Sequence, residues 1–292
     1  METRRHLLIA GTGRAGTSAL VQYLSALGLD THLSRPGGSA HWDDRAQAGF
    51  EDLPFPTGGD DLPYVIKLPW AYQLIDQILS NPKVRLDAVL IPTRDLVEVS
   101  ASRSIVELQA MHHNAEWLAD IASPWEHWAI TPGGSIYSVS PVDQARLLAV
   151  GFHHLIERIA RADVPLVLVS FARLMSDPDY LFAKVRHLLP ADITAAQARE
   201  VHAATFSSNK VRTGAELRAG ADAGSEQSGF AESGIAPLNN IALKRELQYL
   251  RRELEKLRTR EARRMTNRVW RALTRASRRL HGILTTSQDC AV

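Results

Sequence analysis

The stretch LLIAGTGRAGTSAL, from Leu7 to Leu20, decides how the rest of the chain is interpreted. Four apolar residues run directly into a segment with three glycines, and Thr17 and Ser18 then open a segment with helical periodicity. This order predicts a buried strand, a glycine-rich loop and a helix. Successive backbone N–H groups in such a loop, together with the partial positive charge of a helix N-terminus, form a cradle for an anion.

The loop is close to the Walker A pattern G-x-x-x-x-G-K-[ST] from Gly11 to Ser18, but Thr17 stands in the place of the lysine. The nearest cation is Arg14, inside the loop, whose permanently charged guanidinium suits an oxyanion. The aliphatic segment 86–93 ends in Arg94 and not in a magnesium-binding carboxylate. The pattern therefore disfavours metal-assisted phosphoryl transfer, and we expect no metal site.

Further aliphatic segments along the chain predict the other strands of a sheet, at 64–68, 86–93 and 164–171. Helical patterns alternate with them, at 70–79, 95–111, 141–162 and 177–189. Asp95 and Glu98 form a capping box for the second of these helices. Strands that alternate with helices predict an α/β fold, in which helices cover both faces of a parallel sheet, followed by a C-terminal helical extension. The turn-rich segment 122–141 is interpreted as a surface excursion or lid.

The composition excludes several classes of protein. With 45% hydrophobic and 23% charged residues in 292, the chain can bury a large core and is not disordered throughout. Its apolar runs are too short to span a bilayer, and we expect no signal peptide. The single Cys290 has no partner for an internal disulfide. We therefore expect a cytoplasmic protein.

The C-terminal part has a different charge balance from the rest. Residues 239–292 contain 14 of the 34 Lys and Arg but 5 of the 32 Asp and Glu. These counts favour three parts: an α/β domain over 1–204, a loop and linker over 205–238, and a basic helical tail over 239–292. Leucines at 243, 247, 250, 254 and 257 follow a heptad pattern, which predicts a short coiled coil and self-association through 240–262.

Residues 265–284 form an amphipathic pattern. Apolar residues fall on one side of a helical wheel (Val269, Trp270, Leu273, Leu280 and Leu284) and arginines on the other (Arg264, Arg268, Arg271, Arg275, Arg278 and Arg279). A helix over 263–285 could therefore contact a membrane surface, pack against a partner helix or collect a polyanion. Nucleic acid is disfavoured because no recognition motif accompanies the charge. We expect a cytoplasmic protein that is peripheral at a membrane if this helix binds lipid.

Two motifs in the chain resemble those of sulfotransferases that use 3′-phosphoadenosine 5′-phosphosulfate (PAPS). GTGRAGTSAL is similar to their 5′-phosphosulfate loop, x-x-[KR]-[SAT]-G-[ST]-[ST], with Arg14 as the basic residue. LIPTRDLVEVSASR is similar to their 3′-phosphate segment, in which a strand ends in arginine and a serine follows eight residues later, here Arg94 and Ser102. LVSFARLMSDP is a partial third match, with Ala172 where an acidic residue is common. The resemblance covers roughly residues 5–190.

The resemblance implies a sulfotransferase-type fold related to P-loop NTPases and transfer of a sulfuryl group from PAPS, without a metal, to an acceptor hydroxyl, for example of a carbohydrate or glycolipid. It implies that Arg14 stabilises the transferred group and the leaving phosphate. It also implies that PAPS contacts eight residues of the two motifs: Gly13, Arg14, Ala15, Gly16, Thr17, Ser18, Arg94 and Ser102.

The general base is less clearly indicated by the sequence. Many cytosolic members of that family carry a histidine in a K-T-H motif, but here Lys67 is followed by Leu68 and no histidine. The segment GFED resembles one in bacterial carbohydrate-type sulfotransferases, which implies Glu51 as the base, with Asp52 and His41 as alternatives. Lys67, at a strand end near the same edge as Arg14, is expected to assist at the sulfuryl group.

Two other functions remain open at this point. The chain could be a P-loop kinase or nucleotide-binding protein with a degenerate Walker A loop. It could also be a membrane-attached scaffold with a vestigial nucleotide fold. The acceptor is not identified by the sequence, because its pocket would be built from the segments 30–62 and 110–140.

Overall fold

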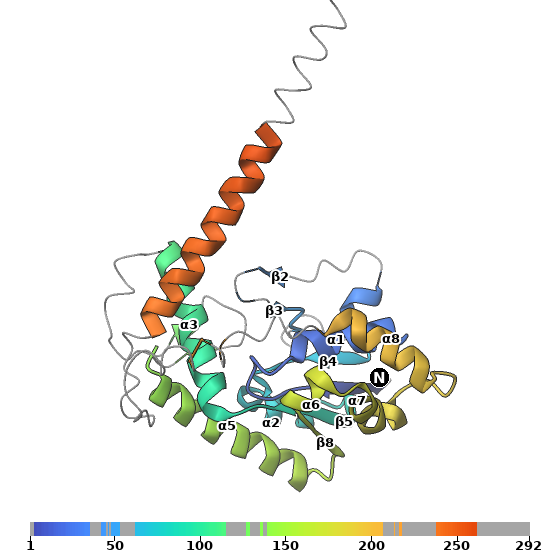
Figure 1. Cartoon of the computed structure of the whole chain (residues 1–292). Helices are drawn as coiled ribbons and strands as arrows, with labels where there is room; N and C mark the ends of the chain where they lie inside the picture. The colour runs from blue at the N-terminus through green and yellow to red at the C-terminus, as the bar shows by residue number, and fades with distance from the viewer. Residues whose placement is uncertain are drawn as a thin grey trace, which may run out of the picture. The chain divides into compact units, whose positions relative to one another are not determined.

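The computed structural model describes residues 3–35, 42–44, 46, 48–52, 62–114, 127–128, 135–136, 139–206, 213, 216–217 and 238–261. The chain divides into two compact units, Met1–Leu243 and Lys244–Val292. The first unit contains a four-stranded parallel sheet in the order β4-β1-β5-β8 (Figure 1). Its strands are β1 (Arg4–Ile9), β4 (Val65–Lys67), β5 (Val84–Thr93) and β8 (Leu166–Ser170). The predicted α/β fold with a parallel sheet is thus confirmed.

Alternate residues of the central strands face two separate hydrophobic cores. Leu7 and Ile9 of β1 pack with α1 (Thr17–Ala26), α6 (Phe171–Ser176), α7 (Pro178–Val185) and α8 (Ala195–Thr205). Leu8 packs on the other face with α2 (Ile75–Ser80) and α5 (Pro141–Arg161). Successive side chains of a strand point to opposite faces of the sheet. Because helices cover both faces here, consecutive residues in the buried parts of the central strands have to be apolar, which explains the continuous apolar runs in the sequence.

The remaining elements do not belong to the sheet or to the helices that cover its two faces. The long α3 (Leu96–Asn114) follows β5, and three 3₁₀ helices are η1 (His32–Ser34), η2 (Ala71–Gln73) and η3 (Arg186–Leu188). Two small antiparallel pairs join β2 (Trp42–Asp43) to β3 (Ala48–Gly49) and β6 (His127–Trp128) to β7 (Ser135–Ile136). A third core gathers residues of α3, among them Ile105 and Met111, with Leu238 and Ala242.

Some predicted helices differ from those observed. The helix expected over 70–79 is divided into η2 and α2, because Leu74 leaves helical geometry with φ −124° and ψ 4°. One of the two hydrogen bonds of the expected capping box of α3 is present: the backbone N–H of Glu98 donates to Asp95 Oδ1 at 2.9 Å. α3 continues to Asn114, beyond the expected end at Met111. Most of the expected lid over 122–141 lies outside the described residues.

The strand order places a change of direction at β1. The chain passes from β1 to β4 on one side and then to β5 on the other. In open parallel sheets, ligands bind beyond the carboxyl ends of the strands at such a switch point. The loop 10–16 follows β1 and Arg94 follows β5, so both sequence motifs begin at this place.

The C-terminal part forms one helix over 238–261 within the described residues. The boundary between the two compact units falls inside this helix. The division into three parts, with a linker over 205–238, stays a prediction. Most of that linker and the whole amphipathic segment 263–285 lie outside the described residues. Among the described helices, none combines the length and the apolar character needed to cross a membrane.

Candidate functional site

The glycine-rich loop after β1 has an unusual backbone. Gly11, Gly13, Arg14 and Gly16 all have positive φ angles, and that of Arg14 is 51°. Gly16, at φ 86°, also has no space for a side chain, because an added Cβ would lie 2.9 Å from Leu174 Cδ2. A non-glycine residue in the left-handed region is uncommon and costs free energy. The loop is therefore a specifically built turn, and Arg14 is held in it by its surroundings.

The first turn of α1 begins directly after this loop. Gly16 is the N-cap residue and makes no side-chain capping hydrogen bond. Thr17 and Ser18 are buried. The Ser18 hydroxyl donates to the Gly49 carbonyl at 3.1 Å and accepts from the Gly49 N–H at 3.3 Å. These hydrogen bonds hold β3 against the first turn of α1. Because the Ser18 hydroxyl is engaged in them, Ser18 would bind an anion through its backbone N–H.

The structure brings the two predicted motifs together. Arg14 Nε lies 3.4 Å from Ser102 Oγ on α3. Arg94 Nη1 donates to the Arg14 carbonyl at 3.1 Å, and Arg14 Nη1 donates to the Ala46 carbonyl at 2.6 Å. The residues expected to contact a phosphosulfate and a 3′-phosphate therefore share one place beyond the ends of β1 and β5.

Arg94 is largely buried and has several contacts. Its Nε and Nη2 donate to Glu98 Oε2 at 3.0 and 2.8 Å, one turn further along the chain. Its guanidinium lies over the Phe171 ring, 4.6 Å from the centroid. Glu98 is thus an internal counter-ion that a bound phosphate would compete with.

A third guanidinium lies at the loop and was not predicted from the sequence. Arg103 on α3 is 6% exposed, and its Nε donates to Gln144 Oε1 at 3.0 Å. Its Nη1 is 3.5 Å from the Thr12 carbonyl and 3.7 Å from where a Cβ on Gly13 would lie. The available signal was an arginine in a helical segment of small and apolar residues, which implies burial and hence a partner.

Lys67 and Glu51 form an acid–base pair beside the loop. Lys67 is 1% exposed; its Nζ donates to the Gly49 carbonyl at 2.5 Å and lies 3.6 Å from Glu51 Oε1. Burial lowers the pKa of Lys67 to about 8, although the neighbouring Glu51 carboxylate favours its charged form. Trp70 Nε1 donates to Glu51 Oε2 at 3.1 Å. One carboxylate oxygen of Glu51 is thus held by Trp70 while the other faces Lys67.

This pair is connected to the glycine loop through one carbonyl. Gly49 accepts from both the Ser18 hydroxyl and Lys67 Nζ. Arg14 lies close enough for its charge to lower the pKa of Lys67 further. The three residues expected to carry the chemistry, Arg14, Glu51 and Lys67, therefore gather around β3 and the start of α1.

Asp52, an alternative candidate for the base, is engaged in local structure. Its Oδ2 accepts from the Lys67 N–H at 2.7 Å, and its own N–H donates to the Lys67 carbonyl at 2.8 Å. Its Oδ1 pairs with His32 Nδ1, and burial raises the pKa of Asp52. These contacts fix the segment 50–52 against β4. The other alternative, His41, lies outside the described residues.

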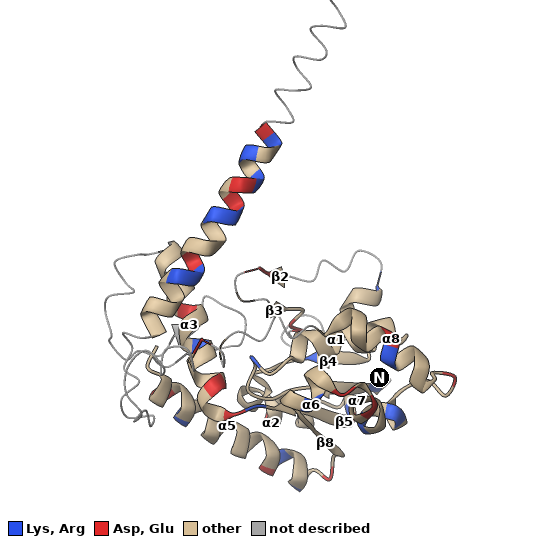
Figure 2. Ribbon diagram, in the orientation of Figure 1, with Lys and Arg blue, Asp and Glu red and all other residues tan. Residues whose placement is uncertain are grey.

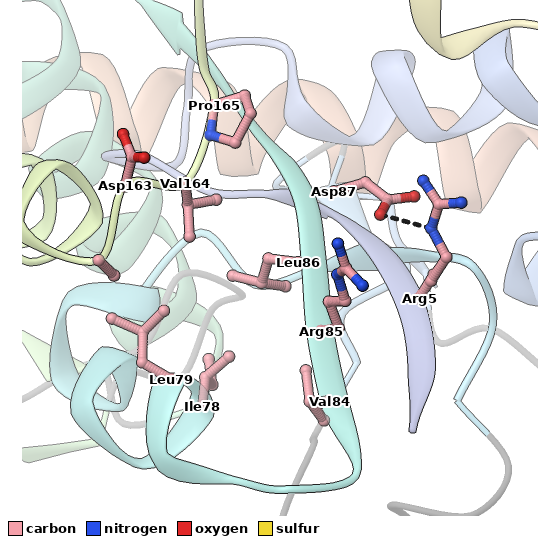
Figure 3. A pocket seen from close by; sticks show the side chains of 11 residues that line it. Arg5, Ile78, Leu79, Val84, Arg85, Leu86, Asp87, Asp163, Val164 and Pro165 are labelled. Carbon is pink, nitrogen blue, oxygen red and sulfur yellow. Dashed lines mark hydrogen bonds and ion pairs between the residues drawn. The ribbon is translucent and has the colours of Figure 1, made fainter. Parts of the chain in front are cut away.

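A separate hollow of about 460 Å³ lies at the opposite edge of the sheet (Figure 3). It is lined by the amino-terminal parts of β1 and β5, including Arg5 and Arg85, and by residues 162–165 before β8. Arg5 Nε donates to Asp87 Oδ1 at 2.7 Å there. Because it lies away from the switch point and its arginines are exposed, it is not the candidate site.

Within the described ranges, no three His, Cys, Asp or Glu side chains are gathered as they would be for a metal ion. No protein-family model matches the sequence, and no curated protein matches it. Among solved structures, sulfotransferase STF9 from Mycobacterium avium is similar to 71% of this chain over 70% of its own length, at 15% identity and a TM-score of 0.39.

Proposed function

We propose that the chain is a sulfotransferase that moves a sulfuryl group from PAPS to an acceptor hydroxyl. The observation that carries the proposal is the meeting of Arg14, Arg94 and Ser102 beyond the ends of β1 and β5. Two sequence motifs resembling the two phosphate-contacting segments of such enzymes are 80 residues apart at Arg14 and Arg94, yet they are in contact.

The residues present fit a nucleotide that carries several negative charges. Arg14, Arg94 and Arg103 are permanent cations next to a turn whose backbone N–H groups lead into a helix. The loop lacks the Walker lysine. A guanidinium neutralises an oxyanion without a metal ion, so the site suits a phosphosulfate better than a magnesium triphosphate.

Each residue of the site then has a defined task. PAPS, when bound, supplies the sulfuryl group. The loop residues Gly13 to Ser18 bind the 5′ side of the donor, and Arg94 and Ser102 bind its 3′-phosphate. Arg14 and Lys67 neutralise the negative charge that develops during transfer. Glu51, oriented by Trp70, accepts the proton of the acceptor hydroxyl.

The acceptor is proposed to be a carbohydrate or glycolipid hydroxyl, because the GFED segment that provides Glu51 resembles carbohydrate-type enzymes. Turnover of labelled PAPS with a panel of glycans, glycolipids, phenols and alcohols tests this choice. Transfer to phenols alone would refute it while leaving the reaction type intact.

The proposal is tested by thermal unfolding with adenosine 3′,5′-bisphosphate in the presence of EDTA. A ligand that binds the native state raises the unfolding temperature with its concentration. We expect stabilisation of the natural protein and of the control Arg85→Ala, whose side chain is exposed at the opposite edge. Arg14→Ala should lower turnover by roughly 100-fold or more. Stabilisation by magnesium ATP alone would instead indicate a nucleotide kinase, and indifference to both ligands would indicate a scaffold.

A further inference from the structure

The helix over 238–261 carries a row of exposed leucines. Their exposed fractions rise from 41% at the first to 54% at the last, at positions Leu243, Leu247, Leu250, Leu254 and Leu257. Single exposed leucines are ordinary, but a continuous apolar strip on a helix marks an interaction surface. The spacing of four, three, four and three residues averages 3.5, the repeat of a left-handed coiled coil.

We propose that this leucine strip binds the same strip of a second copy of the chain, as a parallel, in-register coiled coil from Leu243 to Leu257. In heptad notation Leu247 and Leu254 occupy a positions, and the other three leucines occupy d positions. The strip is self-complementary because each layer then places a leucine against the same leucine of the second copy.

The charges beside the strip select the parallel orientation. The e positions are Lys244, Arg251 and Arg258, all cationic, and Glu253 occupies a partly exposed g position. Figure 2 shows basic and acidic residues in turn along this helix. In a parallel pair a g residue faces the e residue of the next heptad in the other helix. Glu253 of each copy therefore faces Arg258 of the other, and two favourable ion pairs form.

An antiparallel pair would be disfavoured by the same residues. It would place e positions against e positions, and these are cations throughout. Glu246 occupies the preceding g position but is buried, so the charge argument rests on Glu253. Glu253 now contacts Lys256 at 2.6 Å within its own helix; because this surface pair contributes little free energy, it can be exchanged.

The start of the helix is already fixed in each chain. Leu238 and Ala242 are buried in the third core, and Asn239 Oδ1 lies 2.8 Å from His112 Nε2. A coiled coil of about two heptads, from Leu243 to Leu257, would be marginal as isolated peptides, because helix nucleation is unfavourable. In this chain the helix is already nucleated by its contacts in the third core. Pairing of the two copies therefore does not have to supply the free energy of helix nucleation.

The test is sedimentation of the full chain over a concentration series. The natural chain should change from 32.3 kDa towards twice that mass, and the double variant Leu250→Glu/Leu254→Glu should stay at one mass. Both leucines are exposed, so the variant and the natural chain should unfold at the same temperature at concentrations where both are monomeric. The control Arg252→Glu, at an f position outside the strip, should still dimerise. A natural chain that stays monomeric, or a dimer unaffected by the leucine changes, would overturn the proposal.

Orientation is tested separately by disulfide formation. In a Cys290→Ser background, Leu257→Cys should cross-link to itself, because position 257 meets position 257 only in a parallel pair. Cross-linking of Leu243→Cys with Leu257→Cys chains, without self-linking of either, would show an antiparallel pair and overturn the inference. In addition, Glu253→Arg should weaken dimerisation, and Glu253→Arg/Arg258→Glu should restore it.

Discussion

Arg14 Nε and Ser102 Oγ are 3.4 Å apart, although 88 positions separate them in the chain. Arg14 lies in the loop after β1, and Ser102 lies on the helix after β5. Because β1 and β5 are neighbours at the switch point, their following segments meet there. The parallel order of these strands thus brings two distant motifs to one place, where we propose that the donor binds.

Ser102→Ala should weaken the binding of adenosine 3′,5′-bisphosphate without destabilising the protein. The change removes a hydroxyl next to Arg14 and the proposed 3′-phosphate, and one such hydrogen bond contributes about 1 kcal/mol, or roughly fivefold in Kd. Titration calorimetry measures the change. Ser104→Ala is the matched control on the same helix, because the buried Ser104 Oγ has no hydrogen-bond partner in the described part of the chain. Equal effects of both changes would argue against a role for Ser102 in binding.

Arg94→Gln and Glu98→Gln should change ligand affinity in opposite directions. Arg94→Gln removes the proposed cation, so binding of the bisphosphate should weaken by roughly tenfold or more. Glu98→Gln removes the carboxylate that Arg94 contacts at 2.8 Å, so the guanidinium becomes more available and binding should tighten severalfold. Competition binding with a fluorescent analogue checks both variants. Weaker binding in Glu98→Gln would show that Glu98 orients Arg94 for the ligand.

The sequence predicted the elements that have strong local signals. The strand, loop and helix at Leu7 to Leu20 are found as expected, and so are the strands at 64–68, 86–93 and 164–171, within a few residues. The helix α8 was missed. It buries few large apolar side chains, mainly Ala198 and His202 facing the core, so its periodicity is weak. Its capping box at Thr194 and Gln197 was a usable signal.

The site was partly predictable for a related reason. Arg94 and Ser102 could be singled out as candidates because their spacing of eight is local, on a strand-to-helix junction; their role in binding stays a prediction. Arg103 and Trp70 were missed because their roles depend on which way the buried side chains point after the helices pack. The ion pair between Arg94 and Glu98 was not predicted either, although the two residues are four positions apart and lie within one helical turn.

Gly16→Ala should destabilise the protein more than Gly28→Ala. Both glycines have similar positive φ angles, 86° and 89°, so alanine at either position costs about 1 kcal/mol for the left-handed backbone. An added Cβ at Gly28 meets nothing within 4 Å, whereas at Gly16 it lies 2.9 Å from Leu174 Cδ2. Chemical unfolding of the two variants measures the difference. Equal losses would show that the loop and Leu174 move apart easily.

Lys67 should make stability depend on pH in the alkaline range. Its pKa is about 8 in the folded protein and 10.5 in the unfolded chain, so between these values the unfolded state binds more protons. The free energy of unfolding should therefore rise with pH from about 8 to 10.5, by up to roughly 3 kcal/mol, relative to a chain without this amine. Below pH 8 both states carry the charge, and this contribution is constant.

The measurement compares urea unfolding of the natural chain and Lys67→Met at several pH values. Tyrosines titrate in both proteins, so the difference between the two curves isolates Lys67. The same neutralisation should lower sulfuryl transfer as pH rises through about 8, because uncharged Lys67 no longer stabilises the transferred group. A difference in unfolding free energy that stays flat up to pH 10.5 would show that Lys67 keeps an ordinary pKa and that Glu51 holds it charged.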